Sequence, residues 1–112
     1  MTAHAFRKLA VSFSGVIEGS HMNHPDFRVN GKIFATLQGV DRGMIKLTPE
    51  QQAQFIAEYP DIFTPESGAW GRQGCTRVFL RGADAESVGE AMTLAWQLAT
   101  AAAAGKTARK RR

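Results

Sequence analysis

The chain has 112 residues, of which 44% are hydrophobic and 21% are charged, a balance that fits one globular domain and leaves no room for two. Its one cysteine, Cys75, excludes an intramolecular disulfide and a zinc site with several cysteines, so we expect a protein of the reducing cytoplasm. No segment is apolar enough to cross a membrane, and we expect no signal peptide because the first residues lack an apolar run.

The formal net charge of +4 comes from one end of the sequence. Residues 105–112 hold five cations and no acid, whereas residues 1–104 hold nine cations and ten carboxylates, a net charge near −1. We therefore expect a single folded domain over residues 1–104 and a disordered basic tail over residues 105–112. Such a tail attracts phosphates or anionic surfaces without sequence specificity, and a merely solubilising end is the other interpretation.

The first part of the sequence predicts a helix and an edge strand. Apolar residues recur at three- and four-residue steps over residues 2–13, which is typical of an amphipathic helix. Residues 18–22 fit a short edge strand that leads into a loop at His24-Pro25.

A hairpin follows, and it is the strongest local signal in the sequence. Residues 27–29 and 32–37 flank Asn30-Gly31, and both residues of this dipeptide tolerate positive φ in a two-residue turn. After a turn-rich connection, residues 44–47 predict a third strand.

A helix is predicted over residues 49–58. Thr48 provides an N-cap, Pro49 suits the first helical position, and Gln51 completes a capping box. We expect this helix to bury Ala53 and either Phe55 or Ile56.

The last part of the sequence predicts one more strand and one more helix. Residues 61–74 are expected to be irregular, with a short extended piece at Ile62-Phe63, whereas residues 76–81 predict a strand. Asp84 is the expected N-cap of the final helix. The order of elements and the short connections predict an α+β two-layer sandwich, in which helices pack on one face of an antiparallel sheet.

Alternation along the predicted strands assigns most of the cations to one face of this sheet. One set of residues is expected to face the helices: Phe27, Val29, Ile33, Ala35, Leu37, Ile45, Leu47, Thr76, Val78 and Leu80. The opposite face then carries Arg28, Lys32, Phe34, Lys46, Arg77, Phe79 and Arg81. The strand segments hold five of the nine cations of the body and none of its ten carboxylates. Cations with aromatic neighbours are what nucleic-acid binding requires, although a solvated sheet face is the other interpretation.

The segment Gly68–Gly74 has a glycine at every third position, with Trp70 and Arg72 between them. Glycine permits close backbone approach, so this segment is a candidate for bringing Arg72 to an anion. It is neither a Walker loop nor a Rossmann turn, and its GxxG sequence lacks the two helices of a KH domain. The alternative is a turn whose glycines are conformational and whose Trp70 covers the sheet edge.

Two further groups of residues resemble metal or catalytic sites, but neither predicts chemistry. His21 and His24 have the HxxH spacing of metal ligands and Asp26 is close, but third and fourth ligands are not evident, so we expect no metal and no cofactor. Cys75 has Arg72 and Arg77 nearby but no other sign of an activated thiolate, and we expect it to serve in packing.

Several motifs, in order, resemble the MmcQ/YjbR family over roughly residues 6–98. They are His24-Pro25-Asp26-Phe27-Arg28-Val29, Gly31-Lys32-Ile33-Phe34-Ala35-Thr36-Leu37, Lys46-Leu47-Thr48-Pro49-Glu50-Gln51, the stretch from Trp70-Gly71-Arg72 to Leu80, and Ala91-Met92 to Ala95-Trp96. The resemblance implies a YjbR-like domain, comparable to the double-wing arrangement of the MotA C-terminal domain, whose curved sheet presents a saddle to DNA. It also implies DNA binding, and it carries over no catalytic residues.

The sequence thus predicts a non-enzymatic, cytoplasmic domain that binds nucleic acid, specifically double-stranded DNA. The residues expected to contact phosphates are Arg28, Lys32, Lys46, Arg72, Arg77 and Arg81, and those expected to make apolar or stacking contacts are Phe34, Trp70 and Phe79. The alternative is a module for a protein partner or a small anionic ligand, which an apolar and basic face would suit equally well. No membrane partner is expected.

Overall fold

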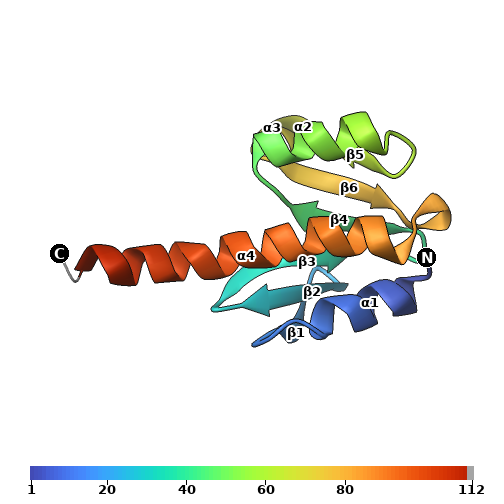
Figure 1. Ribbon diagram of the computed structural model, residues 1–112. Helices are drawn as coiled ribbons and strands as arrows, with labels where there is room; N and C mark the ends of the chain where they lie inside the picture. Colours follow the sequence, from blue (N-terminus) through green and yellow to red (C-terminus); the bar gives the residue numbers. More distant parts are fainter. Residues whose placement is uncertain (111–112) are drawn as a thin grey trace.

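Six antiparallel strands form one sheet in the order β1-β2-β3-β4-β6-β5 (Figure 1). The strands are β1 (Ile17–His21), β2 (His24–Val29), β3 (Lys32–Leu37), β4 (Arg42–Lys46), β5 (Phe63–Pro65) and β6 (Cys75–Phe79). The helices are α1 (Ala3–Val11), α2 (Pro49–Glu58), α3 (Gly68–Arg72) and α4 (Ala85–Lys110), with a 3-10 turn, η1 (Leu80–Gly82). This computed structural model describes the backbone of residues 1–110 and the side chains of residues 1–101.

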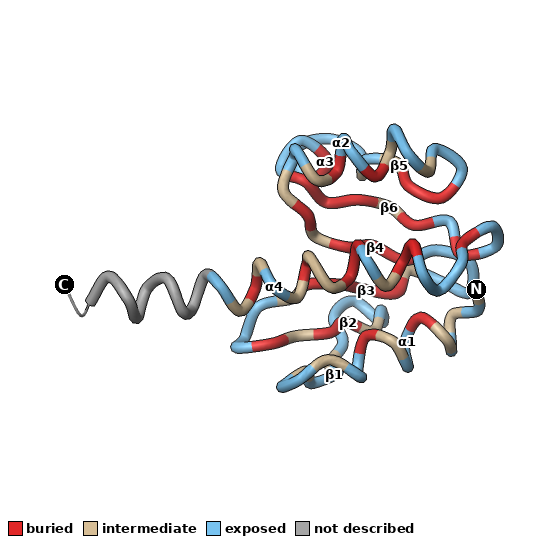
Figure 2. Tube along the Cα trace, viewed as in Figure 1, coloured by how far each residue is buried: buried red, intermediate tan, exposed pale blue. Residues whose placement is uncertain are grey.

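Helices α1 and α4 pack on one face of the sheet, and α2 continues this layer beyond β6 (Figure 1). Phe55 of α2 contacts Phe63 of β5 with ring centroids 5.3 Å apart. Buried residues concentrate in the central strands and on the inner side of α4 (Figure 2). Four of them lie opposite one another across β2, β3, β4 and β6, namely Phe27, Ala35, Ile45 and Thr76, and all are fully buried. This arrangement confirms the predicted α+β fold with helices on one face of an antiparallel sheet.

Helix α2 begins as its sequence predicts, because both hydrogen bonds of the capping box form. The Thr48 hydroxyl accepts from the Gln51 amide, and the Gln51 side chain accepts from the Thr48 amide, each at 3.1 Å. The predicted buried face is wrong in one respect, since Ala53 is exposed and Gln52 is buried. The Nε2 amide of Gln52 donates to the carbonyls of Gly71 and Cys75, both at 3.0 Å, and so connects α2 to α3 and β6.

Two tight turns connect the first three strands. Asn30 and Gly31 have φ values of 53° and 77°, which confirms the predicted hairpin turn between β2 and β3. Met22 and Asn23 also have positive φ, 51° and 66°, and they join β1 to β2. The loop predicted at His24-Pro25 is therefore wrong, because the chain reverses two residues earlier and both residues pair within β2.

A β-bulge in β3 overturns the assignment of Phe34 to the exposed face. Phe27 pairs with Ala35 while Arg28 pairs with Ile33, so Phe34 is an extra residue between two registered pairs. Phe34 consequently joins the core, where it is 1% exposed and meets Phe13 edge-on, with centroids 6.2 Å apart. Ile33 turns to the opposite face. Burial of a phenylalanine stabilises by about 1.5–3 kcal/mol, which favours the bulge over a regular ladder.

The C-terminal elements differ from the prediction at their ends. Residues 68–74, expected to be irregular, contain α3, and β6 stops at Phe79, so Arg81 lies in η1 rather than in a strand. Asp84 caps α4 as predicted, since its Oδ2 accepts from the Ser87 amide at 3.0 Å. The backbone of α4 is described to Lys110, but the side chains of the predicted basic tail lie outside the described residues. What that tail does stays a prediction.

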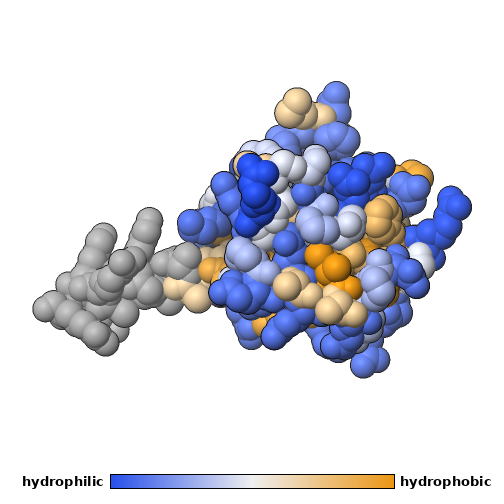
Figure 3. All heavy atoms as spheres, turned by 90° about the horizontal axis from the view of Figure 1, so that it is seen from above, coloured by the Kyte–Doolittle hydropathy of each residue, from blue (hydrophilic) through white to orange (hydrophobic). Residues whose placement is uncertain are grey.

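The surface at the α2–α3 end is mostly hydrophilic, with smaller apolar areas between the polar residues (Figure 3). Among the described residues, no helix combines the length and the apolar content that crossing a membrane requires.

Replacement of Gln52 by leucine is expected to lower the free energy of unfolding by about 1–3 kcal/mol, because the carbonyls of Gly71 and Cys75 each lose one of their two donors and keep only a backbone amide. Urea denaturation measures this loss. Gln54→Leu on the exposed side of α2 is the matched control and is expected to change stability by less than about 0.5 kcal/mol. Equal effects in the two variants would contradict the role of Gln52.

Candidate functional site

The sheet face away from α1, α2 and α4 carries one row of residues that lie opposite one another across all six strands. The row is Gly19, Asp26, Thr36, Met44, Arg77 and Thr64. By alternation along the strands the same side carries His21, Arg28, Gln38, Arg42, Lys46, Cys75 and Phe79, and the β-bulge adds Ile33, which pairs with Arg28. We call this surface the open face. Of the predicted strand residues, Arg28, Lys46, Arg77 and Phe79 do lie on it.

Arg28 is held by a buried carboxylate. Its Nε and Nη2 atoms donate to the two oxygens of Asp26 at 2.6 and 3.0 Å, and Asp26 is fully buried. Nδ1 of His21 lies 2.8 Å from the same carboxylate. The Arg28 guanidinium, followed by His21, holds the pKa of Asp26 below its ordinary value against the opposing effect of burial. An ionised carboxylate only accepts, so Nδ1 of His21 is the donor of this hydrogen bond.

Arg77 is paired in a similar way on the other side of the row. Its Nη2 and Nε atoms lie 2.8 and 3.3 Å from Oε1 of Glu66, which directly follows β5. The predicted strands do not include Asp26 or Glu66. The open face therefore contains two carboxylates that alternation along those strands does not assign to it, and these compensate the charge of two of its arginines.

Two cations of the open face remain without a carboxylate within ion-pair distance among the described residues. They are Lys46, which was predicted, and Arg42, which was not. Nζ of Lys46 lies 5.9 Å from the centroid of the Trp70 ring, within the range of a cation–π contact. Trp70 belongs to α3 and is 64% exposed, so it does not seal the sheet edge but presents its indole to the open face.

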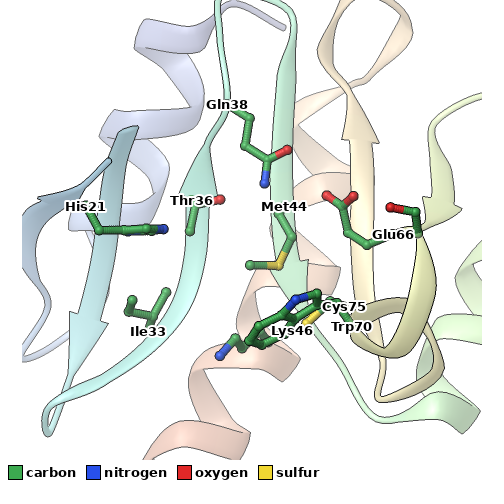
Figure 4. A pocket seen from close by; sticks show the side chains of 10 residues that line it. His21, Ile33, Thr36, Gln38, Met44, Lys46, Glu66, Trp70 and Cys75 are labelled. Atoms are coloured by element: carbon green, nitrogen blue, oxygen red, sulfur yellow. The ribbon is translucent and has the colours of Figure 1, made fainter. Parts of the chain in front are cut away.

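A pocket of about 270 Å³ lies on the open face between β3, β4 and α3. Figure 4 shows His21 reaching toward it from β1, Thr36 and Met44 along its floor, and Trp70 beside Lys46 at one end. Its polar lining consists of His21, Thr36, Gln38, Lys46, Glu66 and Ser67, and the apolar part includes Ile33, Met44 and Cys75. This pocket brings together two predicted residues, Lys46 and Trp70, with several that were not predicted.

Two polar atoms of the pocket lining are buried and have no hydrogen-bond partner. They are Oγ1 of Thr36 and Oε2 of Glu66, and no other side-chain atom within the described residues shares this condition. An unpaired buried polar group costs about 1–3 kcal/mol, so most proteins contain few of them. Sequence patterns gave no signal for either residue, because Thr36 reads as an ordinary strand residue and Glu66 lies in a stretch expected to be irregular.

Cys75 lines the pocket floor but is buried. Burial raises the pKa of its thiol, and the nearby Lys46 only partly offsets this effect. The thiolate is therefore disfavoured, in line with the packing role expected from the sequence.

The remaining predicted residues lie outside this pocket. Lys32 pairs with Val29, whose side chain is in the core, so the prediction that Lys32 lies on the open face is wrong. Arg72 is exposed at the end of α3, and Arg81 is exposed in η1, beyond the end of β6. Phe79 ends β6 opposite Arg42 and is 40% exposed, which leaves it accessible on the open face.

Close backbone contacts and a positive φ explain why glycine occupies positions 71 and 74 of the 68–74 segment. A Cβ on Gly71 would lie 1.8 Å from the carbonyl oxygen of Glu66. Gly74 has a φ of +107°, and a Cβ there would lie 1.9 Å from the carbonyl oxygen of Leu47. These contacts agree with the interpretation of the glycines as conformational.

The HxxH histidines are opposite each other at the β1–β2 turn. His21 pairs with His24 in register, and the His21 ring is bonded to Asp26. Within the described residues, no three His, Cys, Asp or Glu side chains gather closely enough to hold a metal ion.

The Asp26 carboxylate is expected to make stability depend on pH in the acid range. Its pKa in the fold is lower than in the unfolded chain, so its contribution is complete above about pH 4 and is lost as the pH falls below that value. Asp26→Asn is expected to lower the urea midpoint at pH 7 and to flatten the decline between pH 4 and pH 2. Asp84, whose pKa is also lowered by the Ser87 amide, retains its own share of that decline.

Asp61→Asn is the control for this prediction, because Asp61 is exposed and makes no ion pair within the described residues. An unchanged acid slope in Asp26→Asn would show that the carboxylate is not held as described.

Comparisons with known proteins agree with this fold. The chain is similar to the crystal structure of a Deinococcus radiodurans protein with a DUF419 domain, at 20% sequence identity and a TM-score of 0.74, over 88% of this chain and 78% of that one. Among curated proteins, none matches this chain significantly. The model of the YjbR family matches residues 11–98, and the chain therefore belongs to the YjbR family.

Proposed function

We propose that this protein is a non-enzymatic nucleic-acid-binding domain whose open face contacts double-stranded DNA. The observation that carries the proposal is the convergence of cations and exposed aromatic rings from several elements on one face without a covering helix. They are Arg28, Arg42, Lys46, Trp70, Arg77 and Phe79. The cations can form ion pairs with phosphate groups, and the two aromatic side chains can stack on bases or contact sugars.

The buried carboxylates change how the arginines take part in this binding. A guanidinium has five N–H donors, and Asp26 accepts from two of the N–H groups of Arg28. The remaining donors of Arg28 are held in a fixed orientation, and its side chain is 41% exposed. Such an arginine supports phosphate positioning through hydrogen bonds, whereas its net charge is largely compensated.

The salt dependence of binding follows from this distinction. Each phosphate that a cation neutralises on B-DNA contributes about −0.9 to the slope of log K against log salt concentration. If all four open-face cations take part, the slope of the body is about −3.6, and if only Lys46 and Arg42 do, it is about −1.8. The five cations of residues 105–112 add to this value in the full chain.

A small-ligand-binding module is the second candidate, and the 270 Å³ pocket favours it. A small ligand whose single negative charge pairs with Lys46 would show little dependence on salt, in contrast to a duplex. A protein partner stays the other alternative for the open face.

The test is fluorescence anisotropy with a labelled duplex over a salt series. The background chain carries glutamine at the five tail cations (Lys106, Arg109, Lys110, Arg111 and Arg112), so that the body is measured alone. We expect binding with a slope between about −2 and −4, and we expect Lys46→Ala to reduce the magnitude of that slope by about 1.

Lys8→Ala is the matched control, because Lys8 is exposed on α1, on the helix side of the sheet. It is expected to leave both affinity and slope unchanged. Loss of all binding once the tail is neutralised, or equal effects of the two lysine variants, would overturn the role of the open face.

A further inference from the structure

The two residues that carry an unpartnered buried polar atom both line the same pocket. Thr36 belongs to β3 and Glu66 directly follows β5, yet both residues line the space between β3, β4 and α3 (Figure 4). Unpartnered groups are unfavourable in a folded chain, and their coincidence at one cavity points to hydrogen bonds that are made with a ligand.

The hydrogen-bonding character of these atoms limits the chemistry of the ligand. The Glu66 carboxylate uses Oε1 to accept from Arg77, so Oε2 needs a donor from the ligand. A simple anion offers no such donor and would be repelled by the carboxylate. The Thr36 hydroxyl can donate or accept, and Lys46 only donates. The ligand must therefore carry a hydrogen-bond donor, an N–H or O–H group, together with acceptor atoms.

The shape of the pocket limits the ligand further. At about 270 Å³ it is slightly smaller than the sites of about 300–1,000 Å³ that hold drug-sized molecules, so it suits one ring system. The exposed indole of Trp70 forms one wall, and an aromatic face of this kind stacks with a planar ring. Nζ of Lys46 lies 5.9 Å from the ring centroid, so a positive charge stands beside the ring and is available to a phosphate or a ring carbonyl of the ligand.

We propose that this pocket takes one unstacked nucleobase that carries an exocyclic amino group, stacked on Trp70 and donating to Glu66. A carboxylate that accepts from such an amino group discriminates against thymine, which has a carbonyl at the corresponding position. The inference deepens the proposed function. Whether the base comes from a nucleic acid rests on that function, because a free nucleotide and an unstacked base of a strand offer the same chemistry.

The first measurement is isothermal titration of the full chain with dCMP, dAMP and dTMP. We expect dCMP or dAMP to bind at least tenfold more tightly than dTMP. A second arm compares oligonucleotides of dC and dT as single strands with a matched duplex, and tighter binding of single-stranded dC than of dT identifies the strand as a source of the base.

Variants then assign the contacts. Trp70→Ala removes an exposed ring and is expected to weaken dCMP binding at least tenfold. Glu66→Gln is expected to abolish the preference for dCMP over dTMP. Because that change also removes the negative charge with which Arg77 forms an ion pair, Thr36→Val provides an independent test. It removes a hydroxyl that has no partner in the fold, so thermal stability is expected to hold while dCMP affinity falls severalfold.

Thr64→Val is the matched control, because Thr64 lies in the same cross-sheet row but outside the pocket. It is expected to leave dCMP affinity unchanged. Equal binding of dCMP and dTMP, the absence of mononucleotide binding, or unchanged dCMP affinity in both Trp70→Ala and Thr36→Val would overturn the inference.

The two proposals fail separately. Salt-dependent duplex binding without any base preference leaves the proposed function standing and refutes the pocket. Mononucleotide binding with the expected preference, but without duplex binding by the tail-neutralised chain, supports the pocket and refutes the open face as a duplex interface.

Discussion

The two faces of the sheet cannot both be buried by the helices that this short chain provides, and most features of the molecule depend on that constraint. Helices α1, α2 and α4 cover one face, and the apolar residues of β2, β3, β4 and β6 are turned toward them. Because successive side chains of a strand point to opposite faces of the sheet, the residues that alternate with these apolar ones lie on the open face. The open face is thus determined largely by what the core requires, and its chemistry is what remains available for binding.

Electrostatics on the open face are governed by pairing rather than by the number of cations. Asp26 is fully buried beneath Arg28 and His21, and Glu66 is 87% buried beside Arg77. Removing such carboxylates from water is unfavourable, and the arginines compensate that cost. In return the guanidinium groups are fixed in position. In the proposed function, a surface of this kind suits directed hydrogen bonds with phosphate better than long-range attraction, and that attraction is assigned to Lys46, Arg42 and the basic C-terminal residues.

The pocket contains buried polar groups that lower the stability of the fold. Two unpaired polar atoms, at about 1–3 kcal/mol each, are a sizeable fraction of the stability of a small domain. An apolar residue in place of Thr36 would pack on the sheet without that cost. Groups of this kind are expected where a ligand completes the hydrogen bonds, and here the two atoms lie in a pocket bordered by the most exposed aromatic ring of the open face, Trp70.

Local sequence was sufficient for features that depend on near neighbours in the chain. The capping box of α2, the Asn30-Gly31 turn, the Asp84 cap and the α+β fold class all follow from short-range hydrogen bonds, φ preferences and hydrophobic periodicity, and the structure confirms them. The same periodicity correctly placed Arg28, Lys46, Arg77 and Phe79 on the open face.

Tertiary packing decided the rest, because it depends on contacts between residues that are distant in the sequence. Phe34 lies in the core only because a β-bulge lets it reach Phe13, and no alternation pattern contains that extra residue. The partners of Arg28 and Arg77 lie just outside the predicted strands, so their pairing emerges only from the register of the sheet. The pocket likewise forms where β3, β4 and α3 meet. The sequence by itself determined the helices and strands and the face of the sheet on which most strand residues lie. Only the tertiary structure decided which charges form ion pairs and which buried polar atoms have no hydrogen-bond partner, because both depend on contacts between distant parts of the chain.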